Sequence, residues 1–574
     1  MGKSIKNTIK RIKKLYPDLT VEEYCNCIRL SGESDSWEEI VKVGKMAVTD
    51  RSSGVLNDIK LKGFEEKIHT PRLRDFNLDG KKFDVMIIGA GAIGCAIARE
   101  LSRYDVSVLL VDKENDVGLG QSSRNDGDIR VNLDLNPKQT KYSYSVKGKE
   151  MFTRIAEELS IDYKQTGRLI LFSSNKQKTL IPKLKAHAKK VNNEVIFYSR
   201  RQVLKEFPFA PEWNKGAFLI KSGGEICPYQ YTIALAENAI DNGVKLSLDT
   251  IVEGISVKDG FIQSVQTNRG DVEAQIVINA SGVFSDKIAE MAGDRTFTIH
   301  PKKGTIVVFD KKTDKIVSTS MNKADFSSNP VIEPSISNGS GVFHTIFGNT
   351  LIGQSVEETP LREDFSTDKQ TVFSVFERQK ELTDKLKVED IITYFSGVRA
   401  GNYEDDFVVR KGIFTKNIIE VGAIQPPGLT ASPAIAEQVC EWTIEMLGGA
   451  KENFSFNPYR KGITKVKLMN DEERTKFIKN NPDYGVIVCG CEQVSRGEII
   501  EAVTGLIPAT TTEAVKRRVR AGAGKCQGGS CSPIIADIIA KTSGIPIEHV
   551  NHSTENSPIV YGNTRGDNKW NNLT

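Results

Sequence analysis

Three glycines and one acid in the first third of the chain have the types and spacing of a nucleotide site. Gly89, Gly91 and Gly94 form a G-x-G-x-x-G pattern, and Asp112 follows, at roughly the 20-residue distance expected of the acid that binds a ribose hydroxyl. The glycines of this pattern make a tight turn, admit a pyrophosphate and let a helix pack closely on a strand. The first amides of that helix hold the phosphates. The pattern predicts a dinucleotide site, for NAD or FAD.

Four cysteines near the other end form a second group. Cys489 and Cys491 make a C-x-C, and Cys526 and Cys531 make a C-x4-C. Four thiolates can hold a 2Fe–2S cluster or a structural zinc ion. Zinc sites favour wider spacing at both ends, so the tight C-x-C favours iron–sulfur over zinc, with free thiols as the third alternative.

The remaining cysteines have simpler interpretations. Cys95, Cys227 and Cys440 fall inside apolar helix or strand patterns and are expected in the core. Cys25 and Cys27 have no two further ligands nearby, so we expect them to be structural.

The elements that must position these residues can be read from apolar periodicity. An apolar strand over 83–88, a small-residue helix over 95–100 and a second strand over 106–111 surround the glycine turn. Later patterns predict helices at 147–159 and 231–240 and strands at 167–172 and 273–282. Strands at 305–310, 348–353 and 408–411 predict an antiparallel layer over the substrate. The predicted fold class is therefore α/β with an α+β substrate domain.

Length, charge and hydropathy exclude several classes of protein. The 574 residues should form several domains. The balance of 78 basic and 74 acidic residues, a net charge of +4, does not indicate nucleic acid. No apolar run approaches the ~18 residues of a membrane helix, and the first residues have no signal-peptide pattern. We expect a cytoplasmic protein. The basic stretch 3–14 is interpreted as a solvated leader helix, with peripheral contact at the inner membrane face as the alternative.

Several stretches resemble known families. "DVMIIGAGAIGCAIARELSRYDVSVLLVDKE", "GGEICPYQYTIALAENAIDNGV", "VINASGVFSDKIAEMAG", "YFSGVRA" and "GAIQPPGLTASPAIAE" resemble FAD-dependent oxidoreductases of the D-amino-acid-oxidase superfamily. The similarity is greatest to the branch of glycerol-3-phosphate and 2-hydroxyglutarate dehydrogenases. The cysteine block resembles the bacterioferritin-associated-ferredoxin-like 2Fe–2S domain, including its fusion to anaerobic glycerol-3-phosphate dehydrogenase. "LSGE…GVLNDIKLKG" resembles the BON module.

The resemblance implies the domain organisation. It gives a BON-like module at 1–65, a linker at 66–82 and the oxidoreductase at 83–450, with FAD-binding segments 83–173, 225–300 and 390–450 in a Rossmann-like domain. A linker at 451–480, a small helical 2Fe–2S domain at 481–550 and a partly disordered tail at 551–574 follow.

The resemblance also implies site residues. The cofactor would be FAD, bound by Gly89, Gly91, Ala92, Ile93, Gly94, Asp112, Lys113, Ser122, Ser123, Val252, Ala280, Gly282, Gly428, Leu429 and Thr430. Arg399 matches the arginine that holds the anionic group of the substrate; an ion pair with Glu404 or Asp405 is the simpler interpretation. Cys489, Cys491, Cys526 and Cys531 would hold the cluster.

One departure from the family bears on catalysis. Val131 stands where the branch commonly has a histidine, and Arg130 beside it is an added cation that could join an anion site. The chain has only 6 histidines. His344 is our candidate base and His300 the alternative, because a histidine suits the removal of a hydroxyl proton.

Together these features predict a dehydrogenase of a small anionic secondary alcohol. Glycerol 3-phosphate is the first candidate, and a 2-hydroxy acid or an amino acid is the alternative. Electrons would pass from FAD through the 2Fe–2S cluster to a partner protein, possibly a second flavoprotein. An electron-transfer subunit with an inactive substrate site is the alternative of another class.

Overall fold

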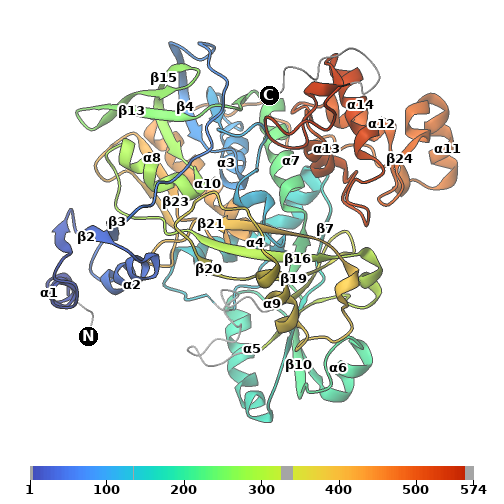
Figure 1. The fold of residues 1–574 in the computed structure, drawn as a ribbon, viewed down its shortest axis with the longest axis horizontal. Helices are drawn as coiled ribbons and strands as arrows, with labels where there is room; N and C mark the ends of the chain where they lie inside the picture. Colours follow the sequence, from blue (N-terminus) through green and yellow to red (C-terminus); the bar gives the residue numbers. More distant parts are fainter. Residues whose placement is uncertain (1–3, 134, 325–340, 563–574) are drawn as a thin grey trace. The chain divides into compact units, whose positions relative to one another are not determined.

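The computed structural model describes residues 4–133, 135–324 and 341–562. The chain divides into two units, Met1–Arg460 and Lys461–Thr574 (Figure 1). Within the described residues, no helix is long and apolar enough to cross a membrane.

A largely parallel sheet holds the nucleotide motif. Its strand order is β12-β5-β4-β15-β14-β13, with β23 beside β15 and β22 beside β23. The strands are β4 (Lys81–Ile88), β5 (Val108–Val111), β12 (Lys245–Ser247), β13 (Val252–Lys258), β14 (Phe261–Thr267), β15 (Gly270–Asn279), β22 (Val408–Lys411) and β23 (Ile418–Gly422). The pairs β12–β5, β5–β4, β4–β15 and β15–β23 are parallel. The carboxyl ends of these strands therefore meet at one edge, where α/β sheets bind ligands.

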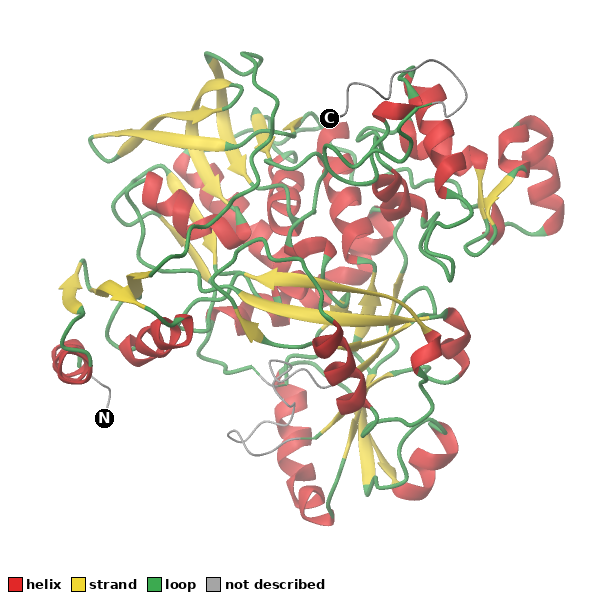
Figure 2. Cartoon of the chain, viewed as in Figure 1, coloured by secondary structure: helices red, strands yellow, loops and turns green. Residues whose placement is uncertain are grey.

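Helices pack against this sheet and against one another (Figure 2). They include α3 (Ala92–Leu101), α4 (Thr140–Glu158), α7 (Pro228–Asp241), α8 (Ser285–Met291) and α10 (Gly428–Met446). α10 packs on both α3 and α4, and α3 packs on α7. Small buried residues such as Cys95, Ala96 and Ala98 on α3 permit this close packing.

A second, mostly antiparallel sheet forms the other layer of this unit. Its order is β20-β16-β19-β18-β17-β8-β10-β9, with β21 beside β16. The strands are β8 (Arg168–Leu171), β9 (Val195–Ser199), β10 (Gly216–Ile220), β16 (Lys302–Phe309), β17 (Ser320–Lys323), β18 (Val342–His344), β19 (Thr350–Gly353), β20 (Glu357–Glu358) and β21 (Ile391–Arg399). α5 (Ile181–Lys190), α6 (Arg200–Glu206) and α9 (Lys369–Gln379) flank it.

A short three-stranded sheet contains the segment that follows Ser122 and Ser123. Its order is β6-β11-β7, formed by β6 (Asp128–Ile129), β7 (Tyr163–Lys164) and β11 (Gly224–Ile226).

Some predicted strands belong to a different sheet from the one expected. Residues 408–411 were expected in the substrate layer, but β22 pairs antiparallel with β23 in the nucleotide sheet, so this expectation is wrong. β8 and β21 lie in the second sheet although they fall within the expected FAD-binding segments. The strands expected at 305–310 and 348–353 do form β16 and β19 of the second sheet.

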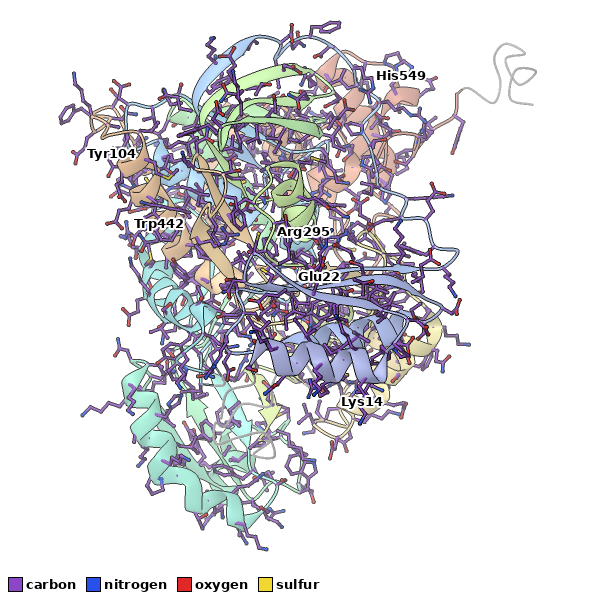
Figure 3. The ribbon with its side chains drawn as sticks, turned by 90° about the vertical axis from the view of Figure 1, so that its left-hand side faces the viewer. Lys14, Glu22, Tyr104, Arg295, Trp442 and His549 are labelled. Carbon is purple, nitrogen blue, oxygen red and sulfur yellow. The ribbon has the colours of Figure 1, made fainter. Side chains whose placement is uncertain are left out.

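The N-terminal residues fold as a small α/β module within the first unit. It contains α1 (Ile5–Leu15), β1 (Thr20–Tyr24), β2 (Cys27–Ser34), α2 (Trp37–Ala47) and β3 (Val55–Leu61). β1 pairs antiparallel with β2, and β2 pairs parallel with β3. Ile12 of α1 is fully buried in the core of the module, so the leader helix is solvated on one side only. Figure 3 labels Lys14 and Glu22 on this module, and Arg295 in the oxidoreductase part.

The C-terminal unit is mainly helical. Its elements are α11 (Asp471–Asn480), β24 (Ile487–Cys489), β25 (Val494–Ser495), α12 (Arg496–Val503), α13 (Thr512–Val519) and α14 (Ser532–Ser543). Buried Ile499, Val515, Ile535 and Ile539 belong to its core. α11 lies in the stretch expected to be a linker. Of the expected disordered tail, residues 563–574 lie outside the described residues.

Candidate active site and iron–sulfur centre

Two glycines of the turn have no space for a side chain. Gly89 has a φ of +107°, and a Cβ there would lie 2.5 Å from the carbonyl oxygen of Ala280. A Cβ on Gly94 would lie 1.9 Å from the carbonyl oxygen of Gly89. Gly91, the N-cap of α3, gives that helix no side-chain cap. Apart from the Ala92 amide, which donates to the Ser122 hydroxyl, the amides at the start of α3 receive no cap from Gly91, which fits a pyrophosphate.

The acid at the end of β5 is held against the same turn. One carboxylate oxygen of Asp112 accepts from the amide of Ala90 at 2.7 Å, and the other accepts from the amide of Glu114 at 3.0 Å. Burial raises the pKa of Asp112 to about 6. The Lys113 side chain, however, pairs with Glu363 and donates to the carbonyl of His69. Asp112 therefore fits a ribose hydroxyl, whereas Lys113 is engaged within the protein.

The other expected cofactor residues lie at three places in this unit. The Ser122 hydroxyl accepts from the Ala92 amide at 2.9 Å, and the Ser123 hydroxyl donates to Gly120 at 3.5 Å. Ala280 and Gly282 follow the end of β15, and Val252 begins β13. Gly428, Leu429 and Thr430 form the first turn of α10 and line a pocket.

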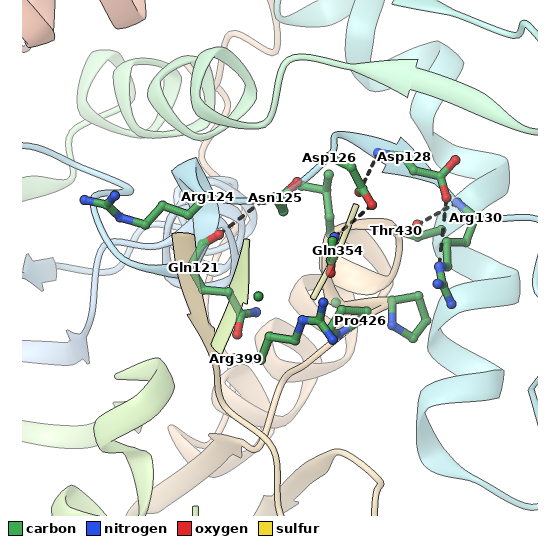
Figure 4. Close-up of a pocket in the computed structure, with 15 residues that line it drawn as sticks. Gln121, Arg124, Asn125, Asp126, Asp128, Arg130, Gln354, Arg399, Pro426 and Thr430 are labelled. Carbon is green, nitrogen blue, oxygen red and sulfur yellow. Dashed lines mark hydrogen bonds and ion pairs between the residues drawn. The ribbon is translucent and has the colours of Figure 1, made fainter. Parts of the chain in front are cut away.

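That pocket combines glycines, prolines and polar side chains from distant segments (Figure 4). Its lining consists of Gln121, Arg124, Asn125, Asp126, Asp128, Arg130, Gly304, Gln354, Gly397, Arg399, Pro426, Pro427, Gly428, Leu429 and Thr430. The loop before β6, strand β16, the end of β19, strand β21 and the start of α10 thus meet here.

Arg399, the last residue of β21, is the cation of the pocket with an unsatisfied atom. Its Nη2 is buried and has no hydrogen-bond partner in the described part of the chain. Burial lowers the pKa of Arg399 to about 10, although Asp126 opposes this shift. A Cβ on Gly304 would lie 3.0 Å from Nη2, so the neighbouring strand leaves room for the guanidinium. A desolvated, incompletely bonded guanidinium is suited to bind an anion.

The alternative interpretation of Arg399, an ion pair with Glu404 or Asp405, does not match the geometry. Asp405 pairs with Lys141 at 2.8 Å, and its other oxygen accepts from Gln425 at 2.6 Å. The carboxylate of Glu404 lies near Gly54 of the N-terminal module. Among the described residues, neither acid forms an ion pair with Arg399.

Asp126 and Asp128 bring two carboxylates to the same pocket. Asp126 accepts from Gln354 Nε2 at 3.0 Å and from the Asp128 amide at 3.3 Å. Asp128 is 2.5 Å from Arg168 and 3.9 Å from Arg130. Sequence reasoning missed both acids and Gln354. The only signal was their proximity to the serine pair and to the strand "GNTLIGQS".

The structure also changes the expectation at Val131. Val131 is fully buried in an apolar cluster with Leu133, Ile170 and Phe172, whereas Arg130 lines the pocket. A histidine at position 131 would therefore point into the core.

Neither candidate histidine lies in the pocket. Nδ1 of His344 is 2.9 Å from Glu225, and Nε2 is 2.6 Å from Asp314. Burial lowers the pKa of His344, but the bonds to these carboxylates outweigh it and raise the pKa overall. His300 pairs with Glu358 at 3.0 Å and stacks on Tyr403. All 6 histidines lie among the described residues, and none lines the pocket. The structure therefore gives no support to either histidine as the base.

The four cysteines of the C-terminal unit form two pairs. Cys491 Sγ is 3.7 Å from Cys526 Sγ, and Cys531 hydrogen-bonds Cys489. That bond and the backbone amides of Gly522 and Glu492 lower the pKa of Cys489 to about 5. Each pair joins one cysteine of the C-x-C to one of the C-x4-C.

This pairing fits a cluster of two metal ions. In a 2Fe–2S cluster four thiolates are shared by two irons, so two pairs suffice. Cys489 and Cys531 are buried, and Cys491 and Cys526 are exposed.

Comparisons with known proteins agree with this geometry. Residues 84–442 match the FAD dependent oxidoreductase family, and residues 487–541 match the BFD-like [2Fe-2S] binding domain. A glycerol 3-phosphate dehydrogenase of Caloramator mitchellensis is 35% identical over 489 residues, which are 84% of this chain and 99% of that protein. A glycerol 3-phosphate oxidase of Mycoplasma genitalium is 27% identical over 387 residues, 65% of this chain and 97% of that protein.

A solved structure shows the same fold. L-alpha-glycerophosphate oxidase from Mycoplasma pneumoniae with FAD bound has a TM-score of 0.60 and 23% identity, over 66% of this chain and 98% of that one. The family match makes the cofactor FAD rather than NAD. The chain belongs to the FAD dependent oxidoreductase family, with a BFD-like [2Fe-2S] binding domain after its oxidoreductase part.

Proposed function

We propose that this protein is a dehydrogenase that oxidises glycerol 3-phosphate to dihydroxyacetone phosphate and passes the electrons to a partner protein. The buried, unsatisfied Nη2 of Arg399 is the observation that carries the proposal, because it places an anion-binding group in the pocket beside the start of α10. The names of the Caloramator and Mycoplasma relatives support glycerol 3-phosphate as the anion.

The residues of the pocket have different roles in binding the substrate. Arg399 binds the phosphate through its guanidinium fork. The amides of the first turn of α10 provide a positive dipole for charge that develops nearby. Pro426, Pro427 and Leu429 contribute an apolar wall that limits water. When bound, FAD supplies the hydride acceptor and the 2Fe–2S cluster supplies a carrier of single electrons.

Anaerobic bleaching of the flavin absorption by glycerol 3-phosphate tests the proposal. We expect bleaching in the wild-type protein and a fall in apparent substrate affinity of about 10- to 100-fold in Arg399→Lys, the size of one or two charge-assisted hydrogen bonds. Arg399→Lys keeps the charge but loses the fork, and its FAD content should be unchanged. A flavin that stays oxidised would contradict the substrate, and unaltered affinity would remove Arg399 from the site.

The alternatives predict other outcomes of the same titration. A 2-hydroxy acid or amino-acid dehydrogenase would be bleached by those compounds instead. An electron-transfer subunit with an inactive substrate site would contain both cofactors and be bleached by none. The electron-accepting partner and a cytoplasmic location, with or without peripheral membrane contact, remain predictions from the sequence.

A further inference from the structure

Oxidation of an alcohol needs a group that takes the hydroxyl proton. The pocket offers few candidates, because its arginines are protonated near neutral pH and its amides and hydroxyl are not bases. None of the 6 histidines lines it. Among the described residues of the lining, two carboxylates remain, Asp126 and Asp128.

The carboxylate of Asp128 lies against two arginines. Its side chain is 8% exposed, Arg168 lies 2.5 Å away and Arg130 lies 3.9 Å away. Proton uptake by Asp128 would leave the buried Arg168 guanidinium, which is 1% exposed, without its counter-charge. Burial raises the pKa of Asp128 although Arg168 opposes the shift, but the close pair with Arg168 gives Asp128 a structural role.

Asp126 is held in place by neutral donors, and the charge of Arg399 acts on it from nearby. In the described part of the chain its two oxygens accept from Gln354 Nε2 at 3.0 Å and from the Asp128 amide at 3.3 Å. Gly127 follows with a φ of +72°, and a Cβ there would lie 2.1 Å from the carbonyl oxygen of Ile226. The turn that presents Asp126 is therefore fixed by a glycine. The carboxylate keeps lone pairs for a further donor.

Two unsatisfied atoms surround this carboxylate. Nη2 of Arg399 and Oε1 of Gln354 are both buried, and neither has a hydrogen-bond partner in the described part of the chain. Figure 4 shows Gln354 between Asp126 and Arg399. A substrate with an anionic end and hydroxyl groups would satisfy both atoms, and its alcohol would lie beside Asp126.

We propose that Asp126 is the catalytic base of this dehydrogenase and that Gln354 is the residue that positions it. The inference rests on the proposed function. The O–H bond of the substrate breaks and its proton moves to a carboxylate oxygen of Asp126. The C–H bond breaks and its electron pair leaves as hydride to oxidised FAD, so that a carbonyl forms. The protonated Asp126 returns its proton to water.

Asp126→Asn tests the base, because it keeps the shape of the side chain and removes its basicity. The rate constant of anaerobic flavin reduction should fall about 10²- to 10⁴-fold, the usual contribution of a general base. FAD content should not change. The dissociation constant of inorganic phosphate, measured by perturbation of the flavin spectrum, should stay within about threefold, since Arg399 is intact.

The pH profile separates a base from a structural residue. The charged groups facing Asp126 are Arg399, Arg130 and Asp128, and the two guanidinium groups keep their charge in the acid range. In the wild-type protein, flavin reduction should slow as pH falls, because a protonated carboxyl cannot accept the hydroxyl proton. This limb should be absent in Asp126→Asn and remain in Gln354→Ala, which only loosens the base. In Asp126→Ala, added formate should restore reduction in proportion to its concentration.

Asp314→Asn is the matched control. Asp314 pairs with His344 outside the pocket, so its variant should reduce flavin within about twofold of wild type. If wild type is bleached and Asp126→Asn is equally fast with the same pH profile, Asp126 is not the base although the function holds. If no candidate alcohol bleaches wild type, the proposed function fails, and the base with it. If another alcohol bleaches it, that alcohol becomes the substrate for the same comparison.

Discussion

At the scale of single residues, the pocket depends on groups whose buried polar atoms are incompletely bonded. Arg399 and Gln354 have such atoms at the site. Glu420, on β23 of the nucleotide sheet, has one away from it: Oε1 has no partner in the described residues, while Oε2 accepts from Asn279 at 2.6 Å. Burial raises the pKa of Glu420 to about 8. This carboxyl is thus neutral in the folded protein at pH 7.

Glu420→Gln should change how stability depends on pH. In the unfolded chain a glutamic acid loses its proton near pH 4.3, whereas folded Glu420 keeps it until about pH 8. The folded state binds more protons in this window, so wild-type stability falls as pH rises through it. Gln cannot ionise, so the variant should unfold at nearly the wild-type temperature at pH 5 and at a higher one at pH 8.5.

Calorimetric melting at several pH values measures this difference. Glu23→Gln, on the exposed strand β1, is the control and should follow the wild-type curve at every pH. Parallel curves for Glu420→Gln and wild type would show that Glu420 ionises normally when buried.

Residue identities at the site could be predicted only where a local constraint fixes them. The glycine turn could be predicted because each glycine is required by a backbone conformation or a close contact within a few residues of it. Asp126 and Gln354 could not be, since they come from segments more than 200 residues apart that only the fold brings together. Asp128 and Arg130 line the pocket whereas Ile129 and Val131 are buried in the core, and this division depends on the course of the chain at and beyond the two-residue strand β6.

At the scale of elements, one set of links between the N-terminal module and the catalytic part reaches the loop after Arg399. Asn57 Nδ2 donates to the Tyr403 hydroxyl at 2.8 Å, and the ring of Tyr403 stacks on His300 with centroids 4.6 Å apart. Gly44 of α2 lies against this ring, since a Cβ there would be 2.2 Å from it. The module therefore holds the loop that begins at Arg399.

Gly44→Ala should destabilise the protein although alanine favours helices. The helix propensity gain is about 1 kcal/mol, but the added methyl would collide with a ring fixed between Asn57 and His300, and overpacking costs about 1–3 kcal/mol. We expect a lower melting temperature and, because the loop shifts, weaker substrate binding. In a Tyr403→Leu background the same substitution should be neutral or stabilising. Equal effects of Gly44→Ala in both backgrounds would show that the ring does not limit position 44.

The elements were predicted best where the pattern is long and local. The strands and helix of the glycine turn follow the apolar periodicity. The strand predicted at 408–411 lies in the other sheet as β22, because its partner β23 is set by the fold and not by its own sequence. The linker predicted at 451–480 contains α11, which begins at a capping box of Asn470 and Glu473. The BON resemblance of the N-terminal module stays a prediction.

At the scale of the whole molecule, the two redox centres belong to separate units of the chain. Both were predictable, because each depends on short spacing rules, glycines in one and cysteines in the other. Their distance and mutual orientation are properties of the assembled molecule, which no spacing rule contains. The roles of the flavin site and the iron–sulfur site can still be separated by experiment, since each unit has its own core.

Cys491→Ser should disconnect the electron path without affecting the flavin. Cys491 is exposed, so its replacement leaves the core of the C-terminal unit intact, while the loss of one of four thiolates should abolish the iron–sulfur absorption and the electron paramagnetic resonance signal of the reduced cluster. FAD content and anaerobic bleaching by substrate should match wild type. Turnover with a one-electron protein acceptor should fall by more than tenfold, whereas a dye that accepts electrons directly from flavin should still support it.

Cys440→Ser, at a cysteine buried in α10 of the other unit, should leave the cluster spectrum unchanged. Undiminished turnover of Cys491→Ser with the protein acceptor would mean that electrons leave from FAD itself and that the cluster has another role.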